Sequence, residues 1–302
     1  MKGTSKICIT GATGFIGKNL VKSLQTLRPL SVTVITRSKE QSEKNLGLFT
    51  EVYIDDGDTE HLINFFIERQ FDTVIHLASL YLKDHESTQI DDLITSNLLF
   101  GTRLLEASVK GSVKYFVNTG TLWQHYEDKL YSPVNLYAAT KQAFEVIAQY
   151  YKETSDIFFT TIYLNDTYGP GDTRRKILNI WNAMGERDRL EMSPGEQIIN
   201  LLHIDDVVDG YIKLIELLQS GELSKDASSA FVLKAKEEMT LRQLAETFER
   251  IAGKRLNINW GGYSYKAREV MTVWNKGVTV PGWAPKVSLD DGLKQFVLLA
   301  RT

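Results

Sequence analysis

Short apolar runs alternate with segments of helical periodicity over the first half of the chain. The strand-like runs begin at residue 6 and recur at 32–36, 51–54, 72–78, 113–117 and 157–164. The run from Thr73 to Leu77 is almost entirely apolar, which is typical of a strand buried on both faces of a parallel sheet. Helical spacing of apolar residues follows the first strand and returns after residue 58 and over 93–107 and 137–152. This alternation predicts an α/β fold, a doubly wound parallel sheet of Rossmann type.

The pattern changes after residue 171, where the predicted elements become shorter and more mixed. Strands are expected at 198–204, 231–234 and 256–260, and helices at 206–218, 240–253 and 289–299. Thr240 and Ser288 stand where the N-caps of the last two helices would lie. We therefore expect a dinucleotide-binding domain over 1–166, with a return near 204–232, and a smaller substrate-binding α/β domain over 167–203 and 233–302. Ligands of open α/β sheets bind beyond the carboxyl ends of the strands, so the cleft between the two parts is the expected site.

A glycine-rich turn directly follows the first predicted strand. Three glycines stand three residues apart, and a helical pattern begins behind them. A tight turn between a strand and a helix N-terminus lets unpaired backbone N–H groups and the helix dipole face an anion. The pyrophosphate of a dinucleotide fits such a turn, whereas the alternative is a turn that only packs the helix on the strand. The residues expected to contact the cofactor here are Gly11, Thr13, Gly14, Phe15, Ile16 and Gly17.

The end of the second predicted strand bears on the choice between NAD and NADP. An NAD site usually places a carboxylate there to accept hydrogen bonds from the ribose 2′-OH. This chain has Arg37 and Ser38 instead, and a guanidinium would bind a 2′-phosphate. We therefore expect NADP, with NAD less favoured; the alternative is that Arg37 is a solvated surface charge. Asp55 and Asp56 end the third strand, where they could meet the adenine amino group or serve only as turn and capping residues.

Composition restricts the class of partner and the compartment. The 302 residues carry a formal net charge of −3, so no basic surplus points to nucleic acid. The single cysteine, Cys8, cannot form an intrachain disulfide, which suits a reducing compartment. No apolar run approaches membrane-spanning length, and the first strand leaves no room for a signal peptide. We expect a cytoplasmic protein with no nucleic-acid, membrane or metal partner.

A tyrosine and a lysine stand four residues apart at the start of a predicted helix. Tyr137 and Lys141 would share one helix face, and a cation beside a phenol favours the phenolate and lowers its pKa. Such a tyrosine is suited to proton transfer. The strand before it ends in Thr119 and Thr121, which would place hydroxyl groups at its carboxyl end. Taken alone, the Tyr137–Lys141 pair is more typical of a surface helix.

Several motifs appear in one order along the whole chain: the glycine-rich turn, His76-Leu77-Ala78, Asn97 ahead of Gly101-Thr102, Thr119, Tyr137 with Lys141, and Tyr168-Gly169-Pro170-Gly171. This combination resembles the extended short-chain dehydrogenase/reductase family, specifically its nucleotide-sugar reductases, epimerases and dehydratases. The resemblance implies that Tyr137 is the catalytic acid/base and that Lys141 lowers its pKa and holds the nicotinamide ribose. It implies Thr119 as the hydroxyl partner of the substrate oxygen, with Thr121 as the alternative. Further cofactor contacts would come from Leu77, Ala78, Ser79, Asn97 and Leu164.

Two departures from the family pattern narrow the chemistry. The family's 4,6-dehydratases carry an acid–base pair directly after the catalytic threonine, where this chain has Gly120 and Thr121. Without that carboxylate, proton abstraction beside a ketone and loss of water lack their usual groups, which argues against a dehydratase. The family often has asparagine two residues before the second motif tyrosine. That place is Asp166 here, so either Asn165 or Asp166 could touch the substrate.

Cations late in the chain are the candidates for a substrate diphosphate. A predicted helix follows Arg174, Arg175 and Lys176. Cations at a helix N-terminus oppose the helix dipole, so an anionic ligand that neutralises them would explain their position. The alternative is a solvated charge cluster. The aromatic segment around Arg268 resembles the tail of bacterial sugar-nucleotide reductases and epimerases, in which the arginine is expected near the diphosphate.

The resulting expectation is an NADPH-dependent reductase of a 4-keto, 6-deoxy nucleotide sugar, such as a CDP- or dTDP-4-keto-hexose. The first alternative is a nucleotide-sugar 4-epimerase that keeps NAD bound. The second is a non-catalytic dinucleotide sensor, although sensors of this fold typically lose the active tyrosine. Relatives often dimerise through the helices that carry Asn97 and Tyr137, so we expect a homodimer.

Overall fold

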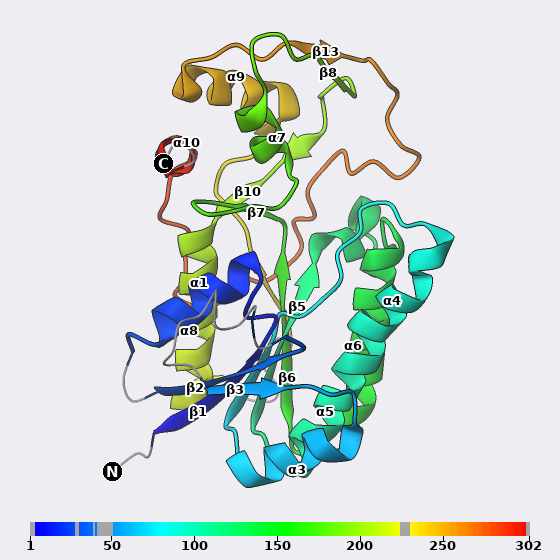
Figure 1. The fold of residues 1–302 in the computed structure, drawn as a ribbon, viewed down its shortest axis with the longest axis vertical. Coiled ribbons are helices and arrows are strands. Elements are labelled where there is room, and N and C mark those ends of the chain that lie inside the picture. The colour runs from blue at the N-terminus through cyan, green and yellow to red at the C-terminus, as the bar shows by residue number, and fades with distance from the viewer. Residues whose placement is uncertain (1–3, 28–29, 39, 41–50, 224–229, 300–302) are drawn as a thin grey trace.

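A seven-stranded, fully parallel sheet organises the molecule (Figure 1). The structure, a computed structural model, describes residues 4–27, 30–38, 40, 51–223 and 230–299. The strands run in the order β11-β6-β5-β4-β1-β2-β3. They are β1 (Ser5–Thr10), β2 (Leu30–Thr36), β3 (Glu51–Ile54), β4 (Thr73–His76), β5 (Tyr115–Thr121), β6 (Phe158–Leu164) and β11 (Ala230–Leu233). The order reverses between β1 and β4, and ligands of open α/β sheets bind beside such a reversal. The predicted doubly wound fold is confirmed.

Helices cover both faces of this sheet, and each face has its own apolar core (Figure 1). On one face lie α1 (Phe15–Leu24) and α8 (Ile204–Ser220), which pack against each other. On the other face lie α3 (Thr59–Arg69), α5 (Phe100–Lys110) and α6 (Leu136–Thr154). α5 continues from α4 (Ile90–Ile94) through a π-helical segment, Thr95–Leu99. The central strands carry apolar side chains on both faces because each face packs into one of these two cores.

A smaller unit lies beyond the carboxyl ends of the central strands (Figure 1). Three short strand pairs belong to it, and they join segments distant in sequence: β7 (Asp166–Tyr168) with β10 (Leu201–His203), β8 (Leu190–Met192) with β13 (Ile258–Trp260), and β9 (Ile198–Ile199) with β12 (Met239–Thr240). Its helices are α7 (Ile177–Ala183), α9 (Leu241–Ala252) and α10 (Leu289–Leu299). Trp181, Phe248 and Leu293 are fully buried in a third core. Because α8 packs on the large sheet and β11 is its edge strand, the chain crosses between the two units more than once. The domain boundaries expected from the sequence stay a proposal.

The expected strands and helices are present, with differences at their ends. β5 continues to Thr121 rather than ending near residue 117, because all seven of its residues pair with β6. The strand expected over 198–204 is two short strands, β9 and β10. Thr240 caps α9 by accepting the N–H of Gln243, and Ser288 Oγ accepts the N–H of Asp291 at the start of α10, as predicted.

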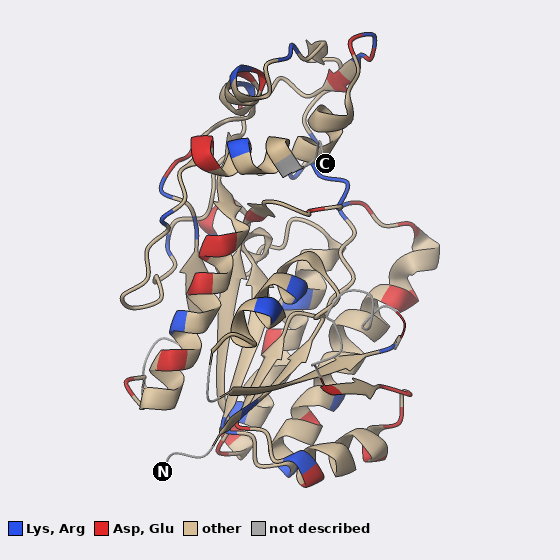
Figure 2. Cartoon of the chain, turned by 60° about the vertical axis from the view of Figure 1, so that its left-hand side comes forward, with Lys and Arg blue, Asp and Glu red and all other residues tan. Residues whose placement is uncertain are grey.

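Figure 2 shows basic and acidic positions interspersed along the helices and loops of both units. That distribution agrees with the small net charge of −3. Within the described part of the chain, no helix combines the length and the apolar character needed to cross a membrane.

Candidate active site

The glycine-rich turn fits between the end of β1 and the loop that follows β4. Gly11 has a φ of +69°, and a Cβ there would stand 2.5 Å from the backbone nitrogen of Ala78. A Cβ on Gly17 would stand 2.2 Å from the carbonyl oxygen of Gly11. Gly14 is different, because its Cβ would meet only that oxygen, at 3.2 Å. The outer glycines therefore allow close packing of turn and helix, while Gly14 leaves the approach to α1 open.

The N-terminus of α1 retains free backbone donors. Gly14 is its N-cap, and no side chain caps the helix. Gly14 N–H donates to Gly11 O (3.0 Å), and its carbonyl accepts from Lys18 N–H (2.9 Å), which closes the turn. Phe15 is buried on the helix and Ile16 packs partly against the sheet core, while Thr13 lies in the turn. This cradle, which a Cβ would fill, has the shape and the donors that a pyrophosphate needs.

The loop after β4 joins the glycine-rich turn to the helix that carries Tyr137. Leu77 N–H donates to Thr10 O (3.3 Å), and Ala78 N–H donates to Thr10 Oγ1 (3.3 Å). Asn97 is buried and holds the next part of the loop. Its Oδ1 accepts from Leu80 N–H (2.7 Å), and its Nδ2 donates to Leu80 O (3.1 Å) and to Thr140 Oγ1 on α6 (2.9 Å). Asn97 thus fixes the loop against α6.

The residues expected around the adenosine hold protein partners. Asp55 forms an ion pair with Arg103 (3.0 Å), and both side chains are almost buried. Asp56 pairs with His61 (2.8 Å) and accepts the N–H of Asp58. The bond between Asp56 and the N–H of Asp58 is the kind of turn contact that the alternative interpretation predicts, whereas the ion pair of Asp55 joins the end of β3 to α5. Arg37 is exposed just beyond β2. Ser38 follows it in a short turn, in which the N–H of Ser38 donates to Thr36 Oγ1 (3.2 Å).

Tyr137 lies in the first turn of α6, beside the loop that follows β4. Asn135 caps this helix by accepting the N–H of Ala138 (2.9 Å). The ring of Tyr137 stands edge-on to that of Tyr81, with 5.0 Å between the centroids. Burial raises the pKa of Tyr137, and a hydrogen bond with Ser79 opposes the rise. Ser79, which lies in the loop after β4, therefore contacts the phenol of Tyr137.

Tyr137 does not have the lowered pKa that its pairing with Lys141 led us to expect, because burial raises that pKa; a contribution from Lys141 itself stays a prediction. Lys141 is 2% exposed, and burial lowers its own pKa to about 8, opposed by the nearby charge of Glu145. The two groups share a helix face, but desolvation penalises the charged form of each and sets the direction of both pKa shifts. Sequence spacing placed the pair correctly and could not reveal the depth of its burial.

The two threonines of β5 have different environments. The Thr119 hydroxyl lies 2.6 Å from the hydroxyl of Tyr211, a buried residue of α8. Thr121 ends the strand, and its Oγ1 accepts the N–H of Trp123 (3.3 Å). The preferred candidate, Thr119, is thus already engaged with α8, and the alternative, Thr121, lies nearer the open end of the sheet.

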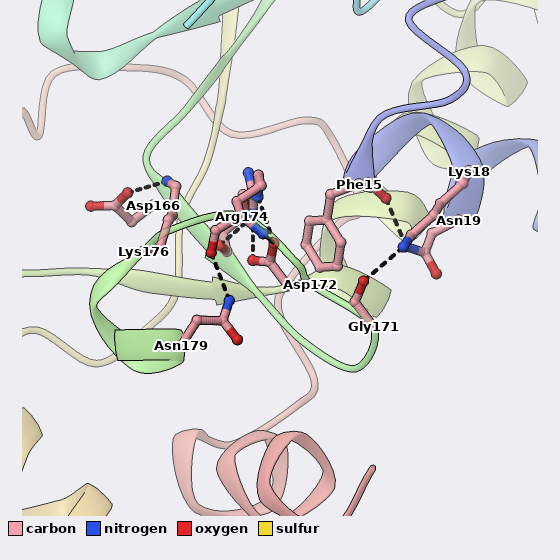
Figure 3. Close-up of polar contacts among 10 residues, drawn as sticks. Phe15, Lys18, Asn19, Asp166, Gly171, Asp172, Arg174, Lys176 and Asn179 are labelled. Carbon is pink, nitrogen blue, oxygen red and sulfur yellow. Dashed lines mark hydrogen bonds and ion pairs between the residues drawn. The ribbon is translucent and has the colours of Figure 1, made fainter. Parts of the chain in front are cut away.

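Two of the three basic residues after β7, Arg174 and Lys176, have carboxylate partners within the protein (Figure 3). Arg174 donates to both carboxylate oxygens of Asp172, at 2.8 and 2.7 Å, and its guanidinium lies 4.4 Å from the centre of the Phe15 ring. Lys176 pairs with Asp166 at 2.5 Å. Burial opposes ionisation of Asp166, but the charge and hydrogen bond of Lys176, together with the charges of Arg174 and Lys83, outweigh it, so the pKa of that carboxyl lies below its ordinary value.

Figure 3 also shows Lys18 of α1 reaching Gly171, to whose carbonyl it donates a hydrogen bond of 2.7 Å. With the Arg174–Phe15 contact, this bond joins the segment after β7 to the helix behind the glycine-rich turn. Arg174 therefore has a structural contact between the two units. Of the two residues considered for substrate contact, Asn165 donates from Nδ2 to Asn200 O (3.1 Å). Asp166, the other candidate, is bonded to Lys176.

Arg268 lies against the loop that follows β5. Its guanidinium stands 4.3 Å from the centre of the Tyr126 ring, and it donates to Ser132 Oγ (2.8 Å). The neighbouring Lys266 forms an ion pair with Asp84 in the loop after β4. The late segment thus contacts the two loops that border Tyr137.

Two aromatic residues near Tyr137 escaped the sequence analysis. Tyr81 lies between Tyr137 and Trp123, whose ring centre is 5.9 Å away, and Lys176 Nζ stands 5.7 Å from the Tyr81 ring. Nothing in the sequence distinguishes these rings from core residues. Glu145 was also missed, although its place four residues beyond Lys141 repeats the Tyr137–Lys141 spacing and could have indicated it.

Comparison with known proteins gives the same assignment as the motifs. A model of the NAD dependent epimerase/dehydratase family matches residues 7–227. CDP-abequose synthase of Salmonella typhimurium is 23% identical over 299 residues, covering 96% of this chain and 97% of that protein. CDP-abequose synthase of Yersinia pseudotuberculosis is 26% identical over 272 residues, covering 88% and 90%.

Among solved structures, UDP-glucuronic acid 4-epimerase from Bacillus cereus, in complex with UDP-glucuronic acid and NAD, is similar with a TM-score of 0.81. The identity is 21%, and the match covers 98% of this chain and 99% of that one. At this identity the likeness shows the fold. Because the family model covers well over half of the chain, the expected resemblance is confirmed, and the protein is an NAD(P)-dependent enzyme of the oxidoreductase type. The chain belongs to the NAD-dependent epimerase/dehydratase family.

Proposed function

We propose that this protein reduces a 4-keto nucleotide sugar, with NADPH as the reductant and a CDP- or dTDP-linked 6-deoxy sugar as the substrate, as in deoxysugar biosynthesis. The observation that carries the proposal is the meeting of Tyr137, Ser79 and buried Lys141 beside the open glycine cradle. The residues fit a dinucleotide, because the cradle excludes side chains and presents unpaired donors. A bound nicotinamide supplies or accepts hydride.

The chain's own groups have separate roles in this proposal. The Tyr137 hydroxyl gives its proton to the oxygen of the substrate carbonyl as the carbon is reduced. Thr121 holds that oxygen by a hydrogen bond, because the hydroxyl of Thr119 is committed to Tyr211. The Lys141 ammonium is buried on the same face of α6 as the phenol. We propose that it binds the nicotinamide ribose and stabilises the tyrosinate left after proton transfer.

Reduction without dehydration is favoured by the residues after β5. Whether Thr119 or Thr121 holds the substrate oxygen, the following positions are Gly120, Leu122 and Trp123, and none carries a carboxylate. The CDP-abequose synthases are relatives over nearly the whole chain, which supports a nucleotide-sugar substrate. The alternative is a 4-epimerase, favoured by the structural likeness to UDP-glucuronic acid 4-epimerase with NAD.

The substrate diphosphate is proposed to bind between Lys176 and Arg268. Both border the loop after β4, since Lys176 lies against Tyr81 and the segment of Arg268 reaches Asp84. Asp166 would set the position of Lys176. The exposed Arg37 at the end of β2 supports NADP over NAD, because a carboxylate is absent at 36–38.

A panel of 4-keto CDP-, dTDP-, UDP- and GDP-sugars, each with NADPH or NADH, tests the proposal. We expect oxidation of NADPH in equal amount to product with a CDP or dTDP substrate, and a preference for NADPH that falls when Arg37→Ala is introduced. Interconversion of two sugars with no net consumption of dinucleotide would instead establish the epimerase. Tyr137→Phe is the control for turnover and should remove nearly all of it.

A further inference from the structure

Glu145 is a partly buried carboxylate with no part in the chemistry above. It lies on α6 one helical turn beyond Lys141 and two beyond Tyr137, on the same face. A carboxylate away from water is costly unless hydrogen bonds satisfy it. Here Tyr163 of β6 donates its hydroxyl proton to Oε2 (2.6 Å), and Gln124 donates from Nε2 to Oε1 (3.1 Å).

Gln124 connects this carboxylate to the end of β5. Its side chain is fully buried, and its Oε1 accepts the N–H of Thr121 at 2.9 Å. The Thr121 hydroxyl caps the same turn, so the two residues hold each other reciprocally. An amide can offer its oxygen to Thr121 only if its NH₂ group finds acceptors on the other side. Glu145 and Gln142, at 3.1 and 3.2 Å, are those acceptors.

The carboxylate also lies one helical turn from the buried lysine. Burial raises the pKa of Glu145, while its hydrogen bonds and the charge of Lys141 oppose the rise. In turn Glu145 opposes the effect of burial on the pKa of Lys141. The other titratable groups here are Tyr163, which is bonded to Glu145, and His76 of β4, whose own pKa is lowered by burial and by Lys141.

We propose that Glu145 is a positioning residue, which fixes the Thr121 turn relative to Tyr137 and Lys141 by orienting the Gln124 amide and which supplies the counter-charge of Lys141. One carboxylate thereby links the helix that carries the acid and the cation to the strand end that carries the hydroxyl. This inference rests on the proposed function for its catalytic consequence; the structural link itself can be measured without any substrate.

The test is Glu145→Gln, compared with Glu153→Gln. Glu153 is exposed on the same helix and accepts a hydrogen bond from Gln149 four residues earlier, so it is a matched control. In Glu145→Gln one acceptor oxygen becomes an NH₂ donor, so the side chain can no longer accept hydrogen bonds from Tyr163 and Gln124 at the same time, and the contacts that orient the Gln124 amide are weakened. We expect kcat to fall about tenfold to a hundredfold, as small misplacements of catalytic groups do, with KM for NADPH within about threefold. The basic limb of the pH profile should move to lower pH, because Lys141 loses the charge that supports its protonated form.

Hydrogen exchange of the Thr121 amide is the readout that needs no substrate. Its exchange should be at least about tenfold faster in Glu145→Gln, because a bond that protects it is lost. A double variant, Glu145→Gln with Gln124→Glu, restores the pattern of donors and acceptors. Its new carboxylate would accept both from the Thr121 amide and from the new side-chain amide on α6. The double variant should return exchange toward the wild-type rate, and it decides the matter if the single variant folds poorly.

Wild-type exchange at Thr121 together with an unchanged kcat and pH profile in Glu145→Gln would overturn the inference. So would failure of the double variant to slow that exchange. If the wild-type enzyme oxidises no NADPH with any sugar of the panel, the proposed function fails, while the exchange data still decide the structural link.

Discussion

At the scale of single residues, burial controls the electrostatics of the site. The sequence places Tyr137 and Lys141 on one helix face, and the structure agrees. The direction of the tyrosine's pKa shift was predicted wrongly, because a sequence shows spacing but not the loss of solvent around both groups. The same limit applies to Arg174. Its ion-pair partner Asp172 is close to it in the sequence, but Phe15, whose ring it also contacts, lies near the start of the chain, and spacing could not predict that contact.

Replacing Lys141 by methionine should change how stability depends on pH. The pKa of Lys141 is about 8 in the folded protein against 10.5 for the free group. Between these values the unfolded chain binds more protons, so the lysine makes stability rise with pH, by about 3 kcal/mol across the window. Urea unfolding of wild type and Lys141→Met from pH 7 to 10.5 measures this. The advantage of Lys141→Met should be largest at pH 7 and shrink as pH rises; a constant difference would contradict the burial of a titrating ammonium. Tyrosines and Cys8 titrate in both proteins and cancel in the difference.

Replacing Thr119 and Thr121 by valine, one at a time, shows which of the two hydroxyl groups holds the substrate oxygen. Thr121→Val should lower kcat/KM about a hundredfold or more, as loss of a donor to the developing charge does. Thr119→Val leaves the Tyr211 hydroxyl without a partner and should cost about 1–3 kcal/mol of stability, with kcat/KM reduced by less than about tenfold. Steady-state kinetics and thermal unfolding on both variants provide the comparison. The reverse order of activities would return the role to Thr119.

At the scale of elements, the sequence determines most of the fold. Apolar strands, the glycine turn and the caps at Thr240 and Ser288 are local signals, and they are confirmed. The ends of elements depend on distant partners: β5 reaches Thr121 because β6 pairs with it throughout. The Glu145–Gln124–Thr121 link joins α6 to β5, and such a link is invisible before the fold is known.

Alanine at two glycines of the turn tests how β1 and α1 meet. The Cβ of Gly17→Ala would lie 2.2 Å from the Gly11 carbonyl oxygen, and backbone must move, so we expect a loss of at least about 1–3 kcal/mol. Gly14→Ala meets the same oxygen at 3.2 Å and should change stability by less than about 1 kcal/mol. Its methyl group would still obstruct a pyrophosphate, so NADPH binding by fluorescence should weaken clearly. Unimpaired binding by Gly14→Ala would argue against the cradle.

At the scale of the whole molecule, an exposed apolar surface supports a homodimer. Ile94 at the end of α4, Leu99 at the end of the π-helical segment, and Val146 and Tyr150 on α6 are 40–63% exposed. We propose that a second copy of the protein covers these four residues. Leu99→Asp with Val146→Asp should convert the dimer to a monomer in light scattering, whereas Leu130→Asp, an equally exposed residue elsewhere, should not. A wild-type monomer at micromolar concentration would contradict the proposal.

The central claim is that hydride reaches a sugar carbonyl carbon while Tyr137 protonates its oxygen. The most direct measurement uses NADPH deuterated at the transferable position of the nicotinamide, with a CDP- or dTDP-4-keto-6-deoxy sugar, followed by NMR and mass spectrometry of the product. We predict one deuterium at the former carbonyl carbon for each NADPH oxidised, and none with Tyr137→Phe. A product without deuterium, or turnover that survives in Tyr137→Phe, would contradict the account.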